Sequence, residues 1–413
     1  LQRARKFSLH DELESFNEFG SSTFVQNRFS NGNLDGVQVP VYQNEFWTSK
    51  QRAANRLHEI SYRACFKPQL PRFFIERLTK PGDVVFDPFM GRGTTLLEAA
   101  LLGRIPFGCD ANPLCRKLIL PRLNPPTISE VAERLSEIDV NAEVETRKDL
   151  RVFYHSKTLR QICALRDYLL KRERQRLTDS IDEWIQMVAL NRLTGHSPGF
   201  FSVYTLPPNQ AVSVESQIRI NKRLRQKPDF RSVPDLILAK SKSLLGNLNK
   251  ETRQLLCSIS TKVKMLARPC EFLPEISDSS VDLVVTSPPF LNVVNYAADN
   301  WLRCWFAGLE SANEPFRIHK NLSDWQQSMN AALTEIFRVV RLGGWVAFEV
   351  GEIQHGKTQL ENAVIPAGVS AGFEVKLVLI NNQKFTKTAN CWGVRNNNLG
   401  TNTNRVVLFQ KLY

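Results

Sequence analysis

VVFDPFMGRGTTLLEAALLGRIPFGCD, residues 84–110, holds the pattern that decides the fold. Its apolar positions predict a strand over residues 84–87, a helix over 94–102 and a second strand over 106–110. A strand, a helix and another strand in so short a span form a βαβ unit, in which the two strands run parallel. The stretch therefore predicts an α/β protein with a mostly parallel sheet.

The loop between the first strand and the helix has the residues to hold a ligand. Gly91 and Gly93 permit positive φ and a close approach of the ligand to the backbone. Thr94 and Thr95 can cap the helix, whose positive end favours an anion such as a carboxylate. Asp87, at the end of the strand, can hold a cation such as an ammonium group. A ligand with a zwitterionic amino-acid end fits both.

Other glycine-loop ligands fit less well. A dinucleotide site would need a third glycine in the G-x-G-x-x-G pattern, and Leu96 stands there. A Walker loop is excluded because G-K-[ST] is missing. Asp110 ends the next strand about 20 residues on, where an acidic side chain hydrogen-bonds ribose hydroxyls in this layout. An aspartate at a strand end is often only a cap, but together these residues favour a nucleoside with an amino-acid tail.

A second ligand-binding position follows the strand predicted over residues 281–285. That strand runs into Ser287, Pro288, Pro289 and Phe290. The prolines fix φ, supply no N–H and bias the preceding residue toward extended backbone. The result is a stiff turn at the carboxyl end of a strand, where open α/β sheets bind ligands. It presents a hydroxyl, backbone carbonyls and an aromatic face to a flat polar ring, unless it is only a proline-capped strand end.

Composition indicates a globular protein. The chain has 413 residues, 42% of them apolar, which predicts two domains. No apolar run approaches the roughly 18 residues that span a bilayer, and the basic start lacks an apolar signal core. Eight scattered cysteines without a C-x-x-C pattern favour reduced thiols and give no zinc signature. We therefore expect a cytoplasmic protein with no metal and no membrane partner.

Positive charge is concentrated in one segment. The net charge is +13, and residues 151–250 contain 18 Lys and Arg against 8 Asp and Glu, so 18 − 8 = +10 lies there. A solvated basic face explains an excess of a few charges. An excess of ten predicts a polyanionic partner.

The order of the segments predicts an α/β domain interrupted by an insertion. Residues 1–45 are polar and aperiodic and predict an irregular arm. Asn-Pro-Pro at residues 124–126 indicates a linker, and Thr127 with Glu130 forms a capping box that opens a helical, basic segment. Four parts result: an amino-terminal arm (1–57), a first half of the α/β domain (58–120), a basic, largely helical insertion (121–260) and a second half of the α/β domain (261–413).

The second half of the α/β domain has its own predicted elements. We expect a helix over residues 322–340, a turn at Gly343 and Gly344, and three strands at residues 345–350, 374–380 and 405–410.

Two motifs together carry a resemblance to a known family. DPFMGRGTT (87–95) and TSPPF (286–290) resemble the amino-group DNA methyltransferases, which use S-adenosylmethionine. HEISYRACFKPQLP (58–71) resembles the segment that covers the methionine end of the cofactor, and residues 267–290 resemble the run from the adenine-contacting turn into the catalytic strand. The resemblance implies a class I methyltransferase fold, Rossmann-like. It also implies that residues 58–120 are a cofactor-binding half, 121–260 an inserted target-recognition domain and 261–413 a catalytic half.

The resemblance also implies which residues bind the cofactor. Two positions depart from the family pattern: Arg92 stands where a small residue is common, and the usual acid of the adenine-contacting turn is replaced around Arg268 to Cys270. The implied cofactor-binding residues are Phe66, Lys67, Asp87, Phe89, Gly91, Gly93, Thr94, Thr95, Asp110 and Cys270.

The implied catalytic residues are Ser287, Pro288, Pro289 and Phe290. Ser287 and the Pro288 carbonyl would accept the N–H groups of a nucleobase amine, whose lone pair is otherwise delocalised into the ring. Phe290 would stack on the base, which must first be flipped out of the duplex. Within the family, serine at this position favours cytosine N4 over adenine N6.

Candidate DNA contacts lie in the insertion and in a late loop. Lys222, Arg223, Arg225 and Lys227 are candidates for phosphate contacts, or form a solvated helix face. His196, with Phe200, Phe201 and Tyr204, forms either a base-reading surface or a small core. Asn390 and Arg395 lie in an Asn-rich loop, residues 384–405, which is either structural or contacts DNA.

The first interpretation is a cytosine-N4 DNA methyltransferase that acts on double-stranded DNA in a restriction–modification system, with a cognate endonuclease as a possible partner. The alternatives are an adenine-N6 enzyme of the same build, an RNA methyltransferase and a catalytically dead DNA-binding protein. A cytosine-C5 enzyme is disfavoured because Cys270 precedes the catalytic strand.

Overall fold

The computed structural model describes residues 8–29, 38–48, 54–63, 65–205, 211–289, 296–309, 322–350, 352–353, 358–382 and 403–413. Its centre is a nine-stranded sheet with the order β1-β2-β10-β11-β7-β6-β3-β4-β5. The strands are β1 Phe24–Phe29, β2 Gln38–Asn44, β3 Val84–Asp87, β4 Ile105–Asp110, β5 Lys264–Ala267, β6 Val281–Thr286, β7 Val340–Val350, β10 Glu374–Asn382 and β11 Thr403–Gln410.

The sheet is mostly parallel, as expected. β3 pairs in parallel with β4 and β6, β4 with β5, and β6 with β7. β11 runs antiparallel between β7 and β10. The predicted βαβ unit is present as β3, the helix α3 (Thr94–Leu101) and β4.

Helices cover both faces of the sheet. Neighbouring residues of a strand point to opposite faces, so each strand contributes side chains to both layers. Val85 and Leu283 pack on one face with α2 (Gln69–Leu78) and α3. Phe86 and Val284 pack on the other with α12 (Leu322–Val339) and α13 (Glu361–Ser370). The nearly continuous apolar runs in β3 and β6 follow from burial on both faces.

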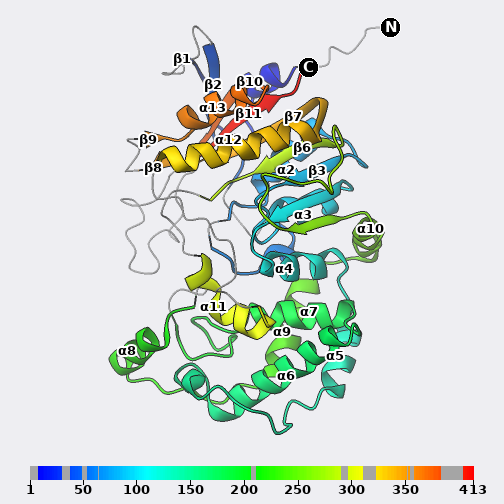
Figure 1. Ribbon diagram of the computed structural model, residues 1–413, viewed down its shortest axis with the longest axis vertical. Helices are drawn as coiled ribbons and strands as arrows, with labels where there is room; N and C mark the ends of the chain where they lie inside the picture. The colour runs from blue at the N-terminus through cyan, green and yellow to red at the C-terminus, as the bar shows by residue number, and fades with distance from the viewer. Residues whose placement is uncertain are drawn as a thin grey trace.

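The described residues after α4 are largely helical, and Figure 1 shows most of these helices as a lobe below the sheet. The Thr127–Glu130 capping box is present at the start of α5. After α4 (Leu114–Leu123), the insertion contains α5 Ile128–Glu137, α6 Ser156–Arg174, α7 Ser180–Leu190, α8 Val214–Leu224, α9 Val233–Leu245 and α10 Lys250–Ser260, with a 3-10 helix at Lys148–Val152.

Two helices pack against a different part of the protein from the one that their position in the sequence suggests. α10 packs against α3 and α4, beside the sheet. α11 (Tyr296–Ala307), which follows the proline turn in the sequence, packs against α4, α6 and α7. The helical lobe therefore includes a segment of the catalytic half.

The expectation of an irregular arm over residues 1–45 is wrong for the described part. After α1 (Leu9–Glu14), β1 and β2 form a hairpin that extends the sheet, and β2 pairs in parallel with β10. Val39 and Val41 are buried on one face of β2. The strand forms because β10 supplies a partner far away in the sequence, which local periodicity does not reveal.

The predicted turn at Gly343 and Gly344 is an irregularity within β7. Gly343 has φ +75°, and β7 continues through it from Val340. Two short strands, β8 (Glu352–Ile353) and β9 (Thr358–Gln359), follow β7. No helix among the described residues is long and apolar enough to span a membrane.

Candidate functional site

Asp87 lies at the carboxyl end of β3, fully buried. Its Oδ1 accepts a hydrogen bond from Thr286 Oγ1 at 2.6 Å and from the Phe89 backbone N–H at 3.1 Å. Burial raises the pKa of Asp87 to about 7, although the bonds from Thr286 and Phe89 oppose the shift. A cation beside this carboxyl group would favour its ionised form.

The glycine loop wraps around the end of β4. Gly91 has φ +48° and Gly93 has φ +74°, both in the left-handed region. The Gly91 N–H donates to Asp110 Oδ2 at 2.9 Å, and the Asn112 N–H donates to Asp110 Oδ1 at 2.8 Å. A Cβ atom at Gly93 would lie 2.4 Å from Ile119 Cγ1, so only glycine fits there.

The expectation that Thr94 and Thr95 cap the helix is wrong. Gly93 is the N-cap residue, and no side chain caps α3. Thr94 and Thr95 are already helical, one and two residues too late to act as the N-cap. Thr95 Oγ1 donates to the Val285 carbonyl at 3.0 Å, and Thr94 Oγ1 accepts from Arg92 Nε at 3.2 Å. The threonines join the helix to β6 and to the loop.

Arg92 fastens the segment at residues 57–60 onto the glycine loop. It is buried, and its Nη1 donates to the Ile60 carbonyl at 2.9 Å. Arg122, also buried, donates from Nη1 to the Leu57 carbonyl at 3.2 Å and from Nη2 to the Arg92 carbonyl. Burial lowers the pKa of Arg122 to about 9. Arg92, which departs from the family pattern, therefore contacts the backbone of this covering segment.

A buried pair of hydrogen-bonded side chains lies behind the same segment. His58 Nε2 and Glu98 Oε1 are 2.7 Å apart, and both side chains are about 1% exposed. Burial lowers the pKa of His58, against the effect of Glu98, and this favours the neutral form of the imidazole. The pair joins the segment to α3.

The proline turn at the end of β6 places Ser287 beside Glu349. Because Thr286 pairs with Phe348 in the parallel ladder of β6 and β7, the next residues of the two strands are neighbours. The Ser287 hydroxyl donates to the Glu349 carboxylate, which also accepts from Asn404 Nδ2 at 3.0 Å. Burial raises the pKa of Glu349, and both hydrogen bonds lower it.

A helix that packs on the sheet also holds the proline turn in place. Pro288 is buried and Pro289 is half-buried. Trp325 Nε1 on α12 donates to the Pro289 carbonyl at 2.9 Å. Phe290 lies outside the described residues, so its stacking role stays a prediction.

Glu349 is a candidate functional residue that sequence reasoning missed. The signal was a lone carboxylate near the end of the apolar strand predicted at residues 345–350. Its significance depends on β7 lying next to β6 in a register that places Glu349 at Ser287, which the sequence does not reveal.

The two predicted motifs meet at the carboxyl ends of two neighbouring strands in the middle of the sheet. β3 and β6 are paired, with Val85 opposite Leu283. The bonds from Thr286 to Asp87 and from Thr95 to Val285 cross between the motifs. The glycine loop and the proline turn therefore form one site.

The remaining predicted cofactor residues lie around this site. Phe66 and Lys67 are half-buried, and burial, with Arg92 nearby, lowers the pKa of Lys67. Phe89 packs against the core that contains Cys270. Burial raises the pKa of the Cys270 thiol, which disfavours the nucleophilic thiolate of a cytosine-C5 enzyme.

Those predicted DNA-binding residues that the structure describes lie away from the sheet. His196 is half-buried, with its ring centroid 5.9 Å from that of Phe200, and Phe200 and Phe201 are buried, which favours the core interpretation for these two phenylalanines. Asn390 and Arg395 lie outside the described residues. Four side chains are exposed on α8 or just after it: Lys222, Arg223, Arg225 and Lys227.

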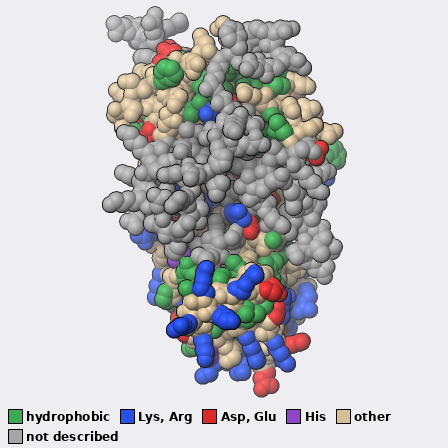
Figure 2. Space-filling view, turned by 90° about the vertical axis from the view of Figure 1, so that its left-hand side faces the viewer, with side chains coloured by type: hydrophobic (Ala, Val, Ile, Leu, Met, Phe, Trp, Pro, Cys, Tyr) green, Lys and Arg blue, Asp and Glu red, His purple; other side chains and the backbone are tan. Residues whose placement is uncertain are grey.

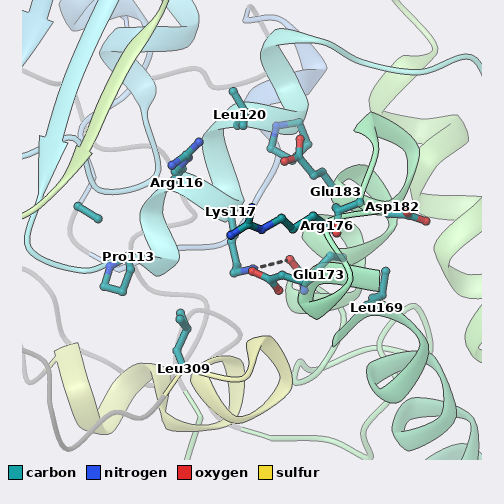
Figure 3. Close-up of a pocket in the computed structure, with 14 residues that line it drawn as sticks. Pro113, Arg116, Lys117, Leu120, Leu169, Glu173, Arg176, Asp182, Glu183 and Leu309 are labelled. Atoms are coloured by element: carbon teal, nitrogen blue, oxygen red, sulfur yellow. Dashed lines mark hydrogen bonds and ion pairs between the residues drawn. The ribbon is translucent and has the colours of Figure 1, made fainter. Parts of the chain in front are cut away.

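A cavity of about 460 Å³ lies between α4 and the insertion helices α6 and α7 (Figure 3). Its wall includes Pro113, which follows β4, and Ala267, the last residue of β5. Lys117 donates to Glu173 at 2.7 Å and to Gln186 at 3.3 Å, which ties the three helices together. The cavity follows the seam between the sheet and the helical lobe. Among the described residues, no cluster of His, Cys, Asp or Glu is suited to a metal ion.

Comparison with known proteins gives consistent matches. Residues 14–119 match the family model of a DNA methylase. The type II methyltransferase M.MvaI of Kocuria varians is 26% identical over 272 residues, which cover 59% of this chain and 54% of that protein. The type II methyltransferase M.BsoBI of Geobacillus stearothermophilus is 23% identical over 274 residues, covering 61% and 52%. Among solved structures, TrmN from Thermus thermophilus matches with 12% identity and a TM-score of 0.34, over 86% of this chain and 52% of that one.

The fold and the site define a class I methyltransferase, with a glycine loop and a proline turn on adjacent parallel strands. The family model over residues 14–119 and the two type II methyltransferases support the predicted resemblance to the amino-group DNA methyltransferases, whose methyl donor is S-adenosylmethionine. The predicted family and cofactor are thereby confirmed. The family comprises cytosine-N4 and adenine-N6 enzymes, and the chain spans about half the length of the curated relatives it matches.

Proposed function

We propose that the chain transfers the methyl group of S-adenosylmethionine to the N4 amine of a cytosine flipped out of duplex DNA. The observation that carries this proposal is the hydrogen bond from Ser287 to buried Glu349, at the sheet edge that Asp87 shares through Thr286. An activated hydrogen-bond acceptor thus lies beside a glycine loop suited to an amino-acid-tailed nucleoside.

The residues of the loop fit the cofactor. The Asp87 carboxylate would pair with the ammonium group of its methionine end, and Asp110 offers carboxylate oxygens to the ribose hydroxyls. Lys67 is half-buried near Arg92, a pairing of cations that favours an anion such as the methionine carboxylate. When bound, the cofactor supplies an electrophilic methyl group on its sulfonium.

Ser287 would act on the amine through its oxygen. Because the serine proton is donated to Glu349, the lone pairs of the hydroxyl oxygen are left to accept an amine N–H. The bond to the carboxylate also polarises the hydroxyl and makes it a better acceptor. The Pro288 carbonyl would accept the second N–H, which draws the nitrogen out of conjugation with the ring.

The same pair offers a route for the proton that the methylated amine must lose. The amine N–H bond would break toward the Ser287 oxygen while the serine proton passes to Glu349. Burial raises the pKa of Glu349, which suits this carboxylate to receive a proton. Phe290, by its place after the prolines, would stack on the flipped ring.

The DNA would lie along one side of the molecule. β8 and β9, which continue from the carboxyl end of β7, lie on the same side as α8 in Figure 1. On that side, Lys and Arg side chains gather over the lower lobe (Figure 2). We propose residues 121–260 as the target-recognition region, with Lys222, Arg223, Arg225 and Lys227 near phosphates.

An adenine-N6 enzyme is the second candidate, because its substrate presents the same amine geometry to Ser287. Serine in the first position of the turn favours cytosine N4 by resemblance to the family. Because M.MvaI and M.BsoBI are type II methyltransferases, we also propose a role in a restriction–modification pair.

The test incubates the protein and methyl-labelled S-adenosylmethionine with duplex DNA of random sequence and, in a parallel reaction, with RNA. The products are then digested and the nucleosides separated. We expect N4-methylcytosine. Label in N6-methyladenine alone would correct the base, and label only in RNA would refute the DNA substrate.

Variants test the assignment of the serine. Ser287→Ala should slow methyl transfer by roughly 10- to 1000-fold, since one transition-state hydrogen bond is lost. Cofactor affinity should stay unchanged. Ser277→Ala, at an exposed serine in the turn before β6, is the matched control and should transfer at the wild-type rate.

A further inference from the structure

Helix α8 is attached to the lobe by side-chain amides. Gln217 is fully buried, and its Nε2 donates to the Tyr204 carbonyl at 3.1 Å. Asn221 Nδ2 donates to the Val152 carbonyl at 2.7 Å, and Gln226 Nε2 donates to the Tyr204 carbonyl at 2.9 Å. Directional bonds along one side of the helix fix its rotation, which apolar packing alone does less strictly.

The opposite side of α8 carries an exposed row at helical spacing. Glu215, Ile218, Arg219 and Lys222 follow i, i+3, i+4 and i+7, so they lie on one face. Ile218 is 50% exposed. A surface helix normally turns its isoleucine toward the core and its amides toward water. α8 does the reverse, with buried amides and an outward isoleucine among charged side chains.

The chemistry of the row matches the edges of base pairs. In the major groove, arginine and lysine donate to guanine, a glutamate accepts from the cytosine amine, and an apolar side chain contacts the thymine methyl group. The groove admits one α-helix, and recognition helices use residues toward their amino-terminal end for base contacts. Glu215, Ile218 and Arg219 lie in the first two turns of α8.

Basic residues continue beyond the row. Arg223 is exposed near the carboxyl end of α8, Arg225 takes the left-handed conformation (φ 49°) that ends the helix, and Lys227 follows. Such side chains contact the phosphates on either side of a groove without reading sequence. α8 also projects from the lobe on the side of the molecule where β8 and β9 continue from the catalytic sheet (Figure 1).

We propose that α8 is a recognition helix whose outward row, Glu215, Ile218, Arg219 and Lys222, reads base edges in the major groove of duplex DNA. The inference rests on the proposed function and extends it from DNA binding to the side chains that set the target sequence. The buried amides hold the row in register, and Arg223, Arg225 and Lys227 hold the helix on the backbone.

The experiment profiles methylation on a random-sequence duplex library for the wild type and single variants. Ile218→Ala, Arg219→Ala and Glu215→Gln should each relax or change the preference at one or two positions of the target by roughly 10-fold. Arg223→Ala should weaken binding on all sequences about equally. Lys262→Ala, at an exposed lysine just after α10 and outside the proposed target-recognition region, should change neither preference nor affinity.

The outcomes separate this inference from the function beneath it. A wild type that methylates a defined sequence, with row variants that stay folded and keep that preference, would overturn the inference alone. A wild type that methylates no duplex would overturn both. Because the row is exposed, we expect the row variants to unfold at nearly the same temperature as the wild type. A changed methylation preference in such a variant then reflects its contact with DNA and not a loss of folding.

Discussion

The buried carboxyl group of Asp87 predicts a pH dependence of cofactor binding. Its pKa is about 7, raised mainly by burial. If the ionised form pairs with the ammonium group of S-adenosylmethionine, only the ionised fraction of the protein is competent to bind. With a pKa of about 7, that fraction is roughly 3% at pH 5.5 and roughly 75% at pH 7.5.

The affinity of the wild type should therefore rise by about 20-fold between pH 5.5 and pH 7.5. Calorimetry with the demethylated product, which keeps the same ammonium group and cannot react, measures this without turnover. Asp87→Asn should bind weakly and with little pH dependence over the same range. A wild type whose affinity is flat across this window would refute the pairing of Asp87 with the ammonium group.

The same group should make stability change with pH in the opposite direction. The carboxyl pKa is near 3.8 ordinarily and about 7 in the fold, so the folded chain binds more protons between these values. Its stabilising contribution is present below about pH 4 and is lost as pH rises through about 7. The melting temperature of the cofactor-free wild type should fall from pH 6 to pH 8 more than that of Asp87→Asn.

Three further predictions follow from contacts at the site and on the lobe. Glu349→Gln should slow single-turnover methyl transfer by roughly 10- to 100-fold at unchanged cofactor affinity, because Ser287 loses its charged acceptor. Gly93→Ala should lower the free energy of unfolding in urea by roughly 2–4 kcal/mol, because it combines positive φ with the contact to Ile119. Replacing Lys222, Arg223 and Arg225 with Ala should reduce the slope of log affinity against log salt by up to about three.

The parts of the fold that sequence predicted are those with local signals. β3 is found at residues 84–87 as expected, and α3 ends one residue earlier than expected. Glycines, prolines and capping residues mark such boundaries because they act on the backbone at their own position. The Thr127–Glu130 capping box shows the same: its two bonds close within three residues.

The parts that sequence missed depend on distant partners. β2 is a strand because β10, more than 300 residues away, pairs with it. Glu349 reaches Ser287 only through the register of β6 and β7. The Thr95 hydroxyl donates to the Val285 carbonyl of β6 and does not cap its own helix. In each case tertiary contacts overrode or added to a local preference that was itself read correctly.

The contacts of α11 bear on how the parts of this protein act together. The helix begins a few residues after the proline turn, yet it lies in the helical lobe against α6 and α7. Asp299 on α11 forms an ion pair of 2.8 Å with Arg63, and Arg303 donates to the Ser61 carbonyl at 3.0 Å. Ser61 in turn donates its N–H to Asn191, at the end of α7, at 2.9 Å.

These bonds join three parts of the proposed mechanism through one short segment. Residues 61–63 belong to the stretch that Arg92 fastens over the glycine loop, α11 continues from the catalytic turn, and α7 lies in the proposed target-recognition region. Burial lowers the pKa of Arg303 and so opposes its positive charge. The side-chain oxygen of Asn300 and the Ser61 carbonyl accept its hydrogen bonds at this junction. A shift of α7 or α11 would therefore act through these contacts on residues 61–63, next to the segment that Arg92 holds over the glycine loop.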